Sequence, residues 1–378
     1  MNAYLDNSAT TAPCKEAIAA VNDAVTSHWG NPSSLHRVGI MAEDILEKAR
    51  KQVADKMFCK PEEVFFTSGG TESNNLALFG AANAMRHRGR RIVSSSVEHS
   101  SIEEALTQLE KQGFEVVRLP VDNYGRVSEK DIAAAVNGET ILVSLMAVNN
   151  EVGTLQPVGS IKRIVTANRS PALIHCDAVQ AFGKMNLKPA TSGFDLMTVS
   201  AHKIHGIKGA GALYVRRGVK LTPVLYGGSQ EGKVRPGTQA VPAIAAFGAA
   251  AEALPGCERS NERVKSLRDY FVYALSEIEG IDINSPSDAL PYLVNISVMG
   301  INSEPMLNYL SNMGVYVSSG SACSKGKKSR VLKAMGLDDR HISSALRISF
   351  SRFTTMDEVD LLLEGIKGIK KTIRPNRK

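Results

Sequence analysis

The chain has 378 residues, of which 43% are hydrophobic and 22% charged, and a formal net charge of +7 at pH 7. This length fits about two domains of ordinary size, and the composition excludes an extensively disordered chain. No stretch approaches the ~20 apolar residues of a membrane span, and no basic, apolar leader opens the sequence, so we expect a cytoplasmic protein. The five cysteines are scattered and form no C-x-x-C pair, which argues against a disulfide framework or a zinc site.

Alternating strands and helices are predicted over the first two thirds of the chain. Apolar residues recur at helical spacing between 41 and 57, which indicates an amphipathic helix. Short β-rich runs then predict strands at 64–67, 91–95, 115–119, 140–147, 172–176, 195–200 and 212–215. Helical patterns between them lie at 102–112, 129–136 and 161–167. This alternation is typical of an α/β domain around a mainly parallel sheet that is buried on both faces.

A domain boundary is predicted after residue 254. The alanine-rich segment 238–254 indicates a long helix that Pro255 and Gly256 end. The pattern beyond it predicts helices at 260–279, at 303–313 and from 355, with strands at 292–298, near 315 and near 346. We therefore expect a large domain over 13–254 and a smaller α+β domain over 255–378, with 1–12 packing against the smaller one.

Two predicted strands end in polar residues that could bind a phosphorylated ring. Gly70 and Thr71 follow the strand at 64–67, where the free amides of a helix start favour an anion. Their spacing fits neither the dinucleotide fingerprint nor the P-loop, and a simple capped turn is the alternative. Asp177 ends a hydrophobic strand and could pair with a protonated ring nitrogen or cap a helix. Gln180 could donate to a ring oxygen or lie on the surface.

Lys203 follows the predicted strand at 195–200 and is flanked by Ser200 and His202. A lysine that forms a Schiff base must be held against a ring and partly desolvated, with hydroxyl and imidazole donors near a phosphate. Most lysines are exposed, so position alone does not assign this role. His99 follows another strand and could stack on an aromatic cofactor and carry protons, or cap the next helix.

Three further residues are candidates for substrate chemistry. Arg347 lies inside a predicted strand, where a substrate carboxylate or a structural carboxylate would offset the cost of burial. Asn150 closes another strand. Cys323 lies in a loop of small residues followed by Lys325 and Lys327, and such cations favour a reactive thiolate. It is the best nucleophile among the five cysteines, with an incidental loop thiol as the alternative.

Together, these motifs resemble the class V pyridoxal-phosphate aminotransferases and, within them, the cysteine desulfurases. The resemblance keeps its order along nearly the whole chain, at 4–11, 67–74, 98–99, 149–153, 177–180, 200–206, 235–239, 318–323 and 347–355. It implies a fold-type I transferase with pyridoxal 5'-phosphate as cofactor and L-cysteine as substrate. Ser351 and Ile207 depart from the glycine and proline usual in the family, and the loop after Cys323 is short and basic, which leaves the sulfur acceptor open.

The resemblance also implies a role for each candidate residue. Lys203 would be the Schiff-base lysine, Cys323 the sulfur-accepting nucleophile and His99 the ring-stacking acid and base. The implied cofactor contacts are Gly70, Thr71, Asn150, Asp177, Gln180, Ser200, His202, Lys203 and Thr238. Asn150 and Arg347 would bind the substrate. Thr238 would reach the phosphate of the neighbouring subunit, so we expect a homodimer with shared active sites.

The implied reaction converts L-cysteine to L-alanine and leaves sulfur as a persulfide on Cys323. A sulfur-acceptor protein, either an iron-sulfur scaffold or a transfer-RNA thiolation enzyme, would then take it. The alternatives are a selenocysteine lyase, another class V aminotransferase, and a non-catalytic scaffold that retains the fold. We expect neither a membrane partner nor direct nucleic-acid binding, because the basic C-terminal residues fit a solvated tail.

Overall fold

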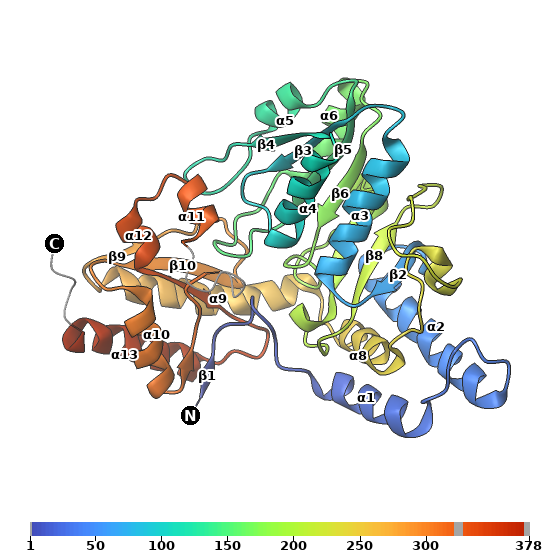
Figure 1. Ribbon diagram of the computed structural model, residues 1–378. Helices are drawn as coiled ribbons and strands as arrows, with labels where there is room; N and C mark the ends of the chain where they lie inside the picture. Colours follow the sequence, from blue (N-terminus) through green and yellow to red (C-terminus); the bar gives the residue numbers. More distant parts are fainter. Residues whose placement is uncertain (1, 321–327, 374–378) are drawn as a thin grey trace.

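The computed structural model describes residues 2–320 and 328–373, and its largest feature is a seven-stranded sheet (Figure 1). The strands are β2 (Val64–Thr67), β3 (Arg91–Ser95), β4 (Glu115–Leu119), β5 (Thr140–Met146), β6 (Leu173–Asp177), β7 (Leu196–Ser200) and β8 (Gly211–Val215). Their order is β2-β8-β7-β6-β5-β3-β4. Neighbours from β7 to β4 pair in parallel, and β8 is antiparallel to both β7 and β2. The predicted α/β class with a mainly parallel sheet is confirmed.

Helices cover both faces of this sheet, because alternate strand residues point to opposite sides. On one face, Leu142 and Leu213 belong to the apolar cluster of α3 (Gly70–Met85) and α4 (Ser100–Lys111). On the other face, Val143 and Ala212 belong to the cluster of α2 (Arg37–Met57) and α8 (Val241–Glu252). The shorter helices of this region are α5 (Glu129–Ala135), α6 (Ile161–Ala167) and α7 (Pro189–Ser192).

A second, antiparallel sheet follows, with the order β12-β10-β9. Its strands are β9 (Ile281–Ile283), β10 (Leu293–Val298) and β12 (Ala345–Ser349). The helices of this part are α9 (Cys257–Ser276), α10 (Ser303–Asn312), α11 (Arg330–Ala334), α12 (Asp339–Ser343) and α13 (Met356–Thr372). Near the amino terminus, β1 (Ala3–Tyr4) pairs in parallel with β11 (Val315–Tyr316), so the first residues lie beside the C-terminal part of the chain (Figure 1). The division into domains at residues 254 and 255 stays a prediction.

Some predicted helix limits were wrong. The alanine-rich helix begins at Val241 rather than at 238, because Pro242 is favoured in the first helical turn. The next helix runs from Cys257 to Ser276, earlier than the predicted 260–279, since it starts directly after Gly256. The helix α1 (Lys15–Ser27) was not predicted at all. Its apolar residues Ala17, Ile18, Val21, Ala24 and Val25 recur at helical spacing, so the signal for a helix was present in the sequence, although only Ala17 and Ala24 are buried.

Among the described helices, none combines the length and the apolar character that crossing a membrane would require.

Candidate active site

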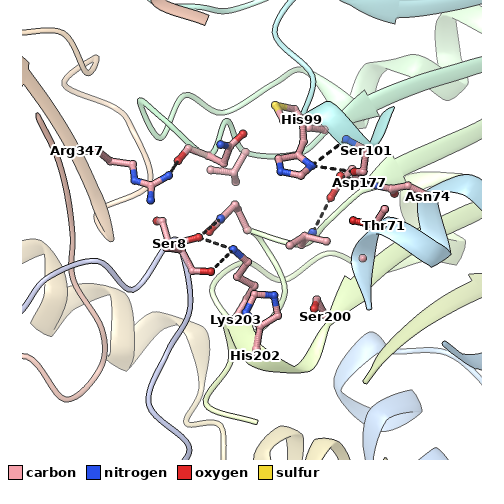
Figure 2. A pocket seen from close by; sticks show the side chains of 17 residues that line it. Ser8, Thr71, Asn74, His99, Ser101, Asp177, Ser200, His202, Lys203 and Arg347 are labelled. Atoms are coloured by element: carbon pink, nitrogen blue, oxygen red, sulfur yellow. Dashed lines mark hydrogen bonds between the residues drawn. The ribbon is translucent and has the colours of Figure 1, made fainter. Parts of the chain in front are cut away.

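A cavity of about 210 Å³ lies where β6 and β7 end, at the carboxyl edge of the parallel strands (Figure 2). Open α/β sheets bind their ligands at this edge. The cavity is lined by Ser8, Ala9, Gly70, Thr71, Asn74, His99, Ser101, Met146, Val148, Asn150, Asp177, Val179, Gln180, Ser200, His202, Lys203 and Arg347. The structure therefore brings together every predicted site residue except Thr238 and Cys323.

Lys203 ends a single 3-10 turn, Ala201–Lys203, that directly follows β7. Its Nζ donates to the backbone carbonyls of Ser8 at 2.5 Å and Ala9 at 3.0 Å. These two residues lie about two hundred positions earlier in the chain, and Ser8 lies beside the Lys203 side chain at the cavity wall (Figure 2). The amino-terminal segment thus fixes where the Lys203 amine points, a role that no local sequence signal indicated.

Asp177 is the last residue of β6 and is buried. Its Oδ2 accepts a hydrogen bond from Asn74 Nδ2 at 2.8 Å, and its Oδ1 accepts one from the backbone N–H of Val179 at 3.0 Å. Turns rather than a helix follow it, so the interpretation as a helix cap was wrong. The carboxylate is oriented into the cavity, where it could meet a protonated ring nitrogen.

Asn74 is a site residue that the sequence reasoning missed. It lies on α3 three positions after Thr71, on the same helical face, and this spacing was the signal that could have found it. Its Nδ2 also donates to Ser101 Oγ at 2.8 Å. Asn74 therefore couples the carboxylate at the end of β6 to the start of α4.

His99 both caps α4 and lines the cavity, so its two interpretations are compatible. Nδ1 accepts from the backbone N–H of Ser101 at 3.2 Å and lies 2.9 Å from the Ser101 hydroxyl. A neutral ring that accepts at Nδ1 carries its proton on Nε2. Burial lowers the pKa of His99, and the nearby Asp177 carboxylate acts in the opposite direction. We therefore treat the ring as neutral, with its Nε2–H not engaged by Ser101.

The residues at the opposite end of the cavity can hold an anion. Ser200 Oγ is buried and has no hydrogen-bond partner among the described residues, and Ser200 Cβ would lie 3.9 Å from a Cβ on Gly70. Gly70 starts α3, and a Cβ there would come within 2.9 Å of Val179 Cγ2. Burial lowers the pKa of His202 to about 4, so its ring is neutral and can donate only one hydrogen bond. An unpaired buried hydroxyl beside the free amides of a helix start fits the phosphate of pyridoxal 5'-phosphate.

Arg347 lies on β12, is only 1% exposed, and contacts both a carboxylate and the cavity. One terminal nitrogen pairs with Asp6 Oδ1 at 2.8 Å, and the other donates to the Asn150 carbonyl at 3.0 Å. Its Nε is buried without a hydrogen-bond partner among the described residues. Asp6 is therefore the structural carboxylate partner that the sequence left as an alternative. The Arg347 guanidinium also borders the space where a substrate carboxylate would lie.

Gln180 is buried, so the interpretation as a surface residue was wrong. Its Nε2 donates to the Ser8 carbonyl at 3.0 Å, the same oxygen that accepts from Lys203. Thr238 is exposed in the loop before α8 and does not line this cavity. Its predicted contact with a neighbouring subunit stays a prediction.

Cys323 lies outside the described residues, but the residues on either side of 321–327 lie beside the cavity. Ser318 exchanges backbone hydrogen bonds with Arg347 at 3.2 and 2.6 Å. Ser329 Oγ donates to Glu151 Oε2 at 2.5 Å, and Glu151 directly follows Asn150 of the cavity wall. Burial raises the pKa of Glu151. Both flanks of the segment that contains Cys323 are thus anchored within reach of the site.

The chain matches known proteins over nearly its full length. Residues 3–362 match the family model described as aminotransferase class-V. It is 41% identical to "Cysteine desulfurase IscS" of Methanosarcina thermophila, over 98% of this chain and 92% of that protein. It is 43% identical to a "NifS/IcsS protein homolog" of Lactobacillus delbrueckii subsp. bulgaricus, over 97% of this chain and 96% of that protein.

Solved structures agree with these matches. A "NIFS-like protein" superposes with a TM-score of 0.93 at 37% identity and covers 99% of this chain and 100% of its own. A structure described as "SspA in complex with cysteine" superposes with a TM-score of 0.82 at 30% identity, over 93% of this chain and 100% of its own. The chain therefore belongs to the class V aminotransferase family and, within it, to the pyridoxal-phosphate-dependent cysteine desulfurases.

Proposed function

We propose that this protein converts L-cysteine to L-alanine and transfers the sulfur atom to Cys323 as a persulfide. The observation that carries the proposal is one cavity that holds Lys203, Asp177 and Arg347 and lies beside both flanks of the Cys323 segment. The atoms balance, since L-cysteine and one enzyme thiol give L-alanine and one enzyme persulfide. A relative named as a cysteine desulfurase supports the same substrate.

Different residues of the cavity would hold different parts of the cofactor. Gly70, Thr71, Ser200 and His202 would hold the phosphate, Asp177 the ring nitrogen and Lys203 the aldehyde carbon, while Gln180 would contact the ring hydroxyl. When bound, pyridoxal 5'-phosphate supplies an electron sink that stabilises negative charge on the substrate Cα. Asn74 serves this arrangement indirectly, because its amide holds the Asp177 carboxylate in place.

Arg347 and Asn150 would orient the substrate. The Arg347 guanidinium is held by Asp6 and by the Asn150 carbonyl, so it cannot swing away from the cavity wall. A planar cation fixed in this way favours a carboxylate in one orientation. The substrate sulfur would then be directed along the cavity towards the edge at which Ser318 and Ser329 lie.

Lys203 and His99 would move the protons. The Lys203 amine would accept the Cα proton, since it lies at the cavity wall between the two ends of the site. His99 Nδ1 accepts from Ser101, so the neutral ring presents Nε2–H as a hydrogen-bond donor, and it would act as a general acid only in its imidazolium form, with a proton on both nitrogens. A fixed tautomer makes the hydrogen-bond donation directional.

Cys323 would take the sulfur. Its thiolate would attack the substrate Sγ, so that an S–S bond forms as the Cβ–Sγ bond breaks and the electron pair stays on carbon. Protons returned to the carbon skeleton complete alanine. The neighbouring Lys325, Lys327 and Lys328 favour the thiolate form that this attack requires.

The proposal also covers the oligomeric state, the location, the sulfur acceptor and the domains of the protein. Thr238 is exposed, as a residue that reaches the phosphate of a second subunit would be, so we propose a homodimer with shared sites. We place the protein in the cytoplasm. The sulfur would pass to an acceptor protein, either an iron-sulfur scaffold or a transfer-RNA thiolation enzyme. Residues 13–254 would form the large domain, and 255–378 the small one together with 1–12.

The test is the product balance. The purified, cofactor-loaded protein is incubated with L-cysteine and dithiothreitol, and alanine, pyruvate and sulfide are measured. We expect alanine and sulfide in equal amounts and no activity in Lys203→Ala. Pyruvate without matching sulfide would identify a transaminase and overturn the proposal. Parallel assays with L-selenocysteine show which of the two substrates the site prefers.

A further inference from the structure

Lys184 is a buried lysine that the proposed reaction does not use. It lies in the turns between β6 and α7, is 9% exposed, and its Nζ lies 5.3 Å from the centroid of the Tyr292 ring. Its backbone carbonyl accepts from Asn261 Nδ2 at 2.9 Å. Among the described residues, no carboxylate forms an ion pair with it. Burying an ammonium group without such a partner is costly, so this position calls for an explanation from function.

A second, small cavity joins Lys184 to Lys203. It measures about 20 Å³, and both lysines line it. This is enough space for one water molecule, which needs about 10–15 Å³. The other titratable residues of its wall are His205, Tyr292 and Arg352, and neither aspartate nor glutamate is among its lining residues. The cavity is thus a low-dielectric space where two lysines meet, and its described lining includes no carboxylate.

The other titratable groups that line the small cavity do not offset the charge of the two lysines. On the side of the small cavity, burial lowers the pKa of His205 to about 4 and raises the pKa of Tyr292, so both are neutral at pH 7. The Arg352 guanidinium is held by the Ala253 carbonyl. Burial, and then the charge of Lys203, lower the pKa of Lys184 to about 7.

On the side of the active site, Lys203 faces four charged or titratable groups. His99 and His202 have lowered pKa values, mainly because of burial, and Arg347 adds a fixed positive charge. Asp177 is the carboxylate among the lining residues. Its two oxygens are already bound by Asn74 and Val179.

We propose that Lys184 and Lys203 form a coupled amine pair, in which Lys184 is a positioning residue that disfavours the protonated form of Lys203. Two ammonium groups that share one desolvated cavity repel each other, so the pair takes up its second proton only at lower pH than a separate lysine would. An unprotonated Lys203 is the form that can attack an aldehyde or accept a proton. The inference rests on the proposed role of Lys203 as the amine that holds the cofactor.

The test measures how fast Lys203 captures pyridoxal 5'-phosphate. Cofactor-free protein is mixed with the cofactor between pH 6 and 9, reduced with borohydride at set times, and the adduct on the Lys203 peptide is quantified by mass spectrometry. At pH 6 the wild type should react about tenfold faster than Lys184→Met. This factor corresponds to a difference of about one unit in the pKa of Lys203 between the two proteins. The two profiles should converge above pH 8, because Lys184 is then neutral in the wild type.

Lys184→Arg distinguishes charge from shape. The guanidinium of the Lys184→Arg variant stays charged at every pH of the assay. This variant should therefore capture the cofactor faster than Lys184→Met across the whole pH range. The matched control is Lys188→Met: Lys188 is exposed, and its Nζ also lies 5.3 Å from an aromatic centroid, that of Phe58. This control removes the same charge and the same type of ring contact, and it should follow the wild type.

Three results would overturn the inference: equal rates for wild type and Lys184→Met at pH 6, an Arg variant that behaves like the Met variant, or an equal shift in Lys188→Met. Removing a buried unpaired charge should be tolerated by the fold, which thermal unfolding checks, and Lys184→Gln offers a second neutral side chain. Failure of the wild type to form any adduct on Lys203 would instead contradict the proposed function.

Discussion

The contact between Asn74 and Asp177 leads to a prediction that the sequence did not suggest. Asn74→Ala removes an amide that is 1% exposed and that donates to Asp177 Oδ2 and Ser101 Oγ, both at 2.8 Å. A hydrogen bond to a charged group contributes about 1.5–3 kcal/mol and a neutral one about 1 kcal/mol, so the loss should be about 2–4 kcal/mol. The Asp177 carboxylate would keep only its bond from Val179 N–H.

This loss is measurable as a melting temperature and as a cofactor affinity. Near 60 °C the unfolding entropy of a chain of 378 residues is about 0.8 kcal/mol per degree, so Asn74→Ala should lower Tm by about 2–5 °C. A carboxylate that is free to turn away from the ring nitrogen should also weaken cofactor binding by about tenfold, or about 1.4 kcal/mol. Calorimetry with and without pyridoxal 5'-phosphate, and a spectroscopic titration of cofactor-free protein, measure the two effects.

Asn75→Ala is the control. Asn75 is the next residue on α3, and its amide donates to the Thr71 carbonyl on the exposed side of the helix at 2.8 Å. Asn75→Ala should change Tm by no more than about 1 °C and should leave the cofactor affinity unchanged, as is usual for surface substitutions. If Asn74→Ala and Asn75→Ala give the same Tm and the same affinity, the orienting role of Asn74 is refuted.

Three further substitutions test other parts of the site. Arg347→Lys should raise KM for L-cysteine at least tenfold, because a lysine cannot contact Asp6 and a substrate carboxylate with a planar fork; an unchanged KM in steady-state assays would exclude that contact. Cys323→Ser should lose sulfide production but retain the visible absorbance of the bound cofactor, and normal sulfide release would refute the nucleophile. His175 is fully buried, and burial lowers its pKa to about 4, below that of an unfolded histidine, so the unfolded state gains a proton first as pH falls. Stability should therefore drop by about 3 kcal/mol between pH 6.5 and 4, and His175→Gln, compared by urea unfolding across this range, should lose less; an identical pH dependence in both proteins would contradict this.

Local patterns predicted the strands and the residues at their ends. Runs such as 64–67 and 91–95 became strands with the predicted limits, because a strand buried on both faces leaves a continuous apolar signal. Asp177 ends one strand and Lys203 follows its parallel neighbour, so the topology alone brings them to one edge. The position of these two residues in the site could therefore be predicted from the sequence.

Contacts between distant segments could not be predicted in the same way. Lys203 donates to Ser8, and Arg347 pairs with Asp6, across separations of 195 and 341 residues. No periodicity or spacing in the sequence encodes such pairs, because they form only when the amino-terminal segment packs beside the cavity in the folded protein. Lys184 is a similar case, because lysines are usually exposed and only the packing of Tyr292 over it shows that this one is buried.

The most direct test of the proposed function follows the sulfur atom itself. The cofactor-loaded protein is treated with a small excess of L-cysteine without reductant, alkylated at once, digested and examined by mass spectrometry. We expect one additional sulfur atom on the peptide that contains Cys323, and none on the peptides of Cys14, Cys59, Cys176 and Cys257, whose pKa values are raised mainly by burial. Alanine formation with no additional sulfur on Cys323 would contradict the account.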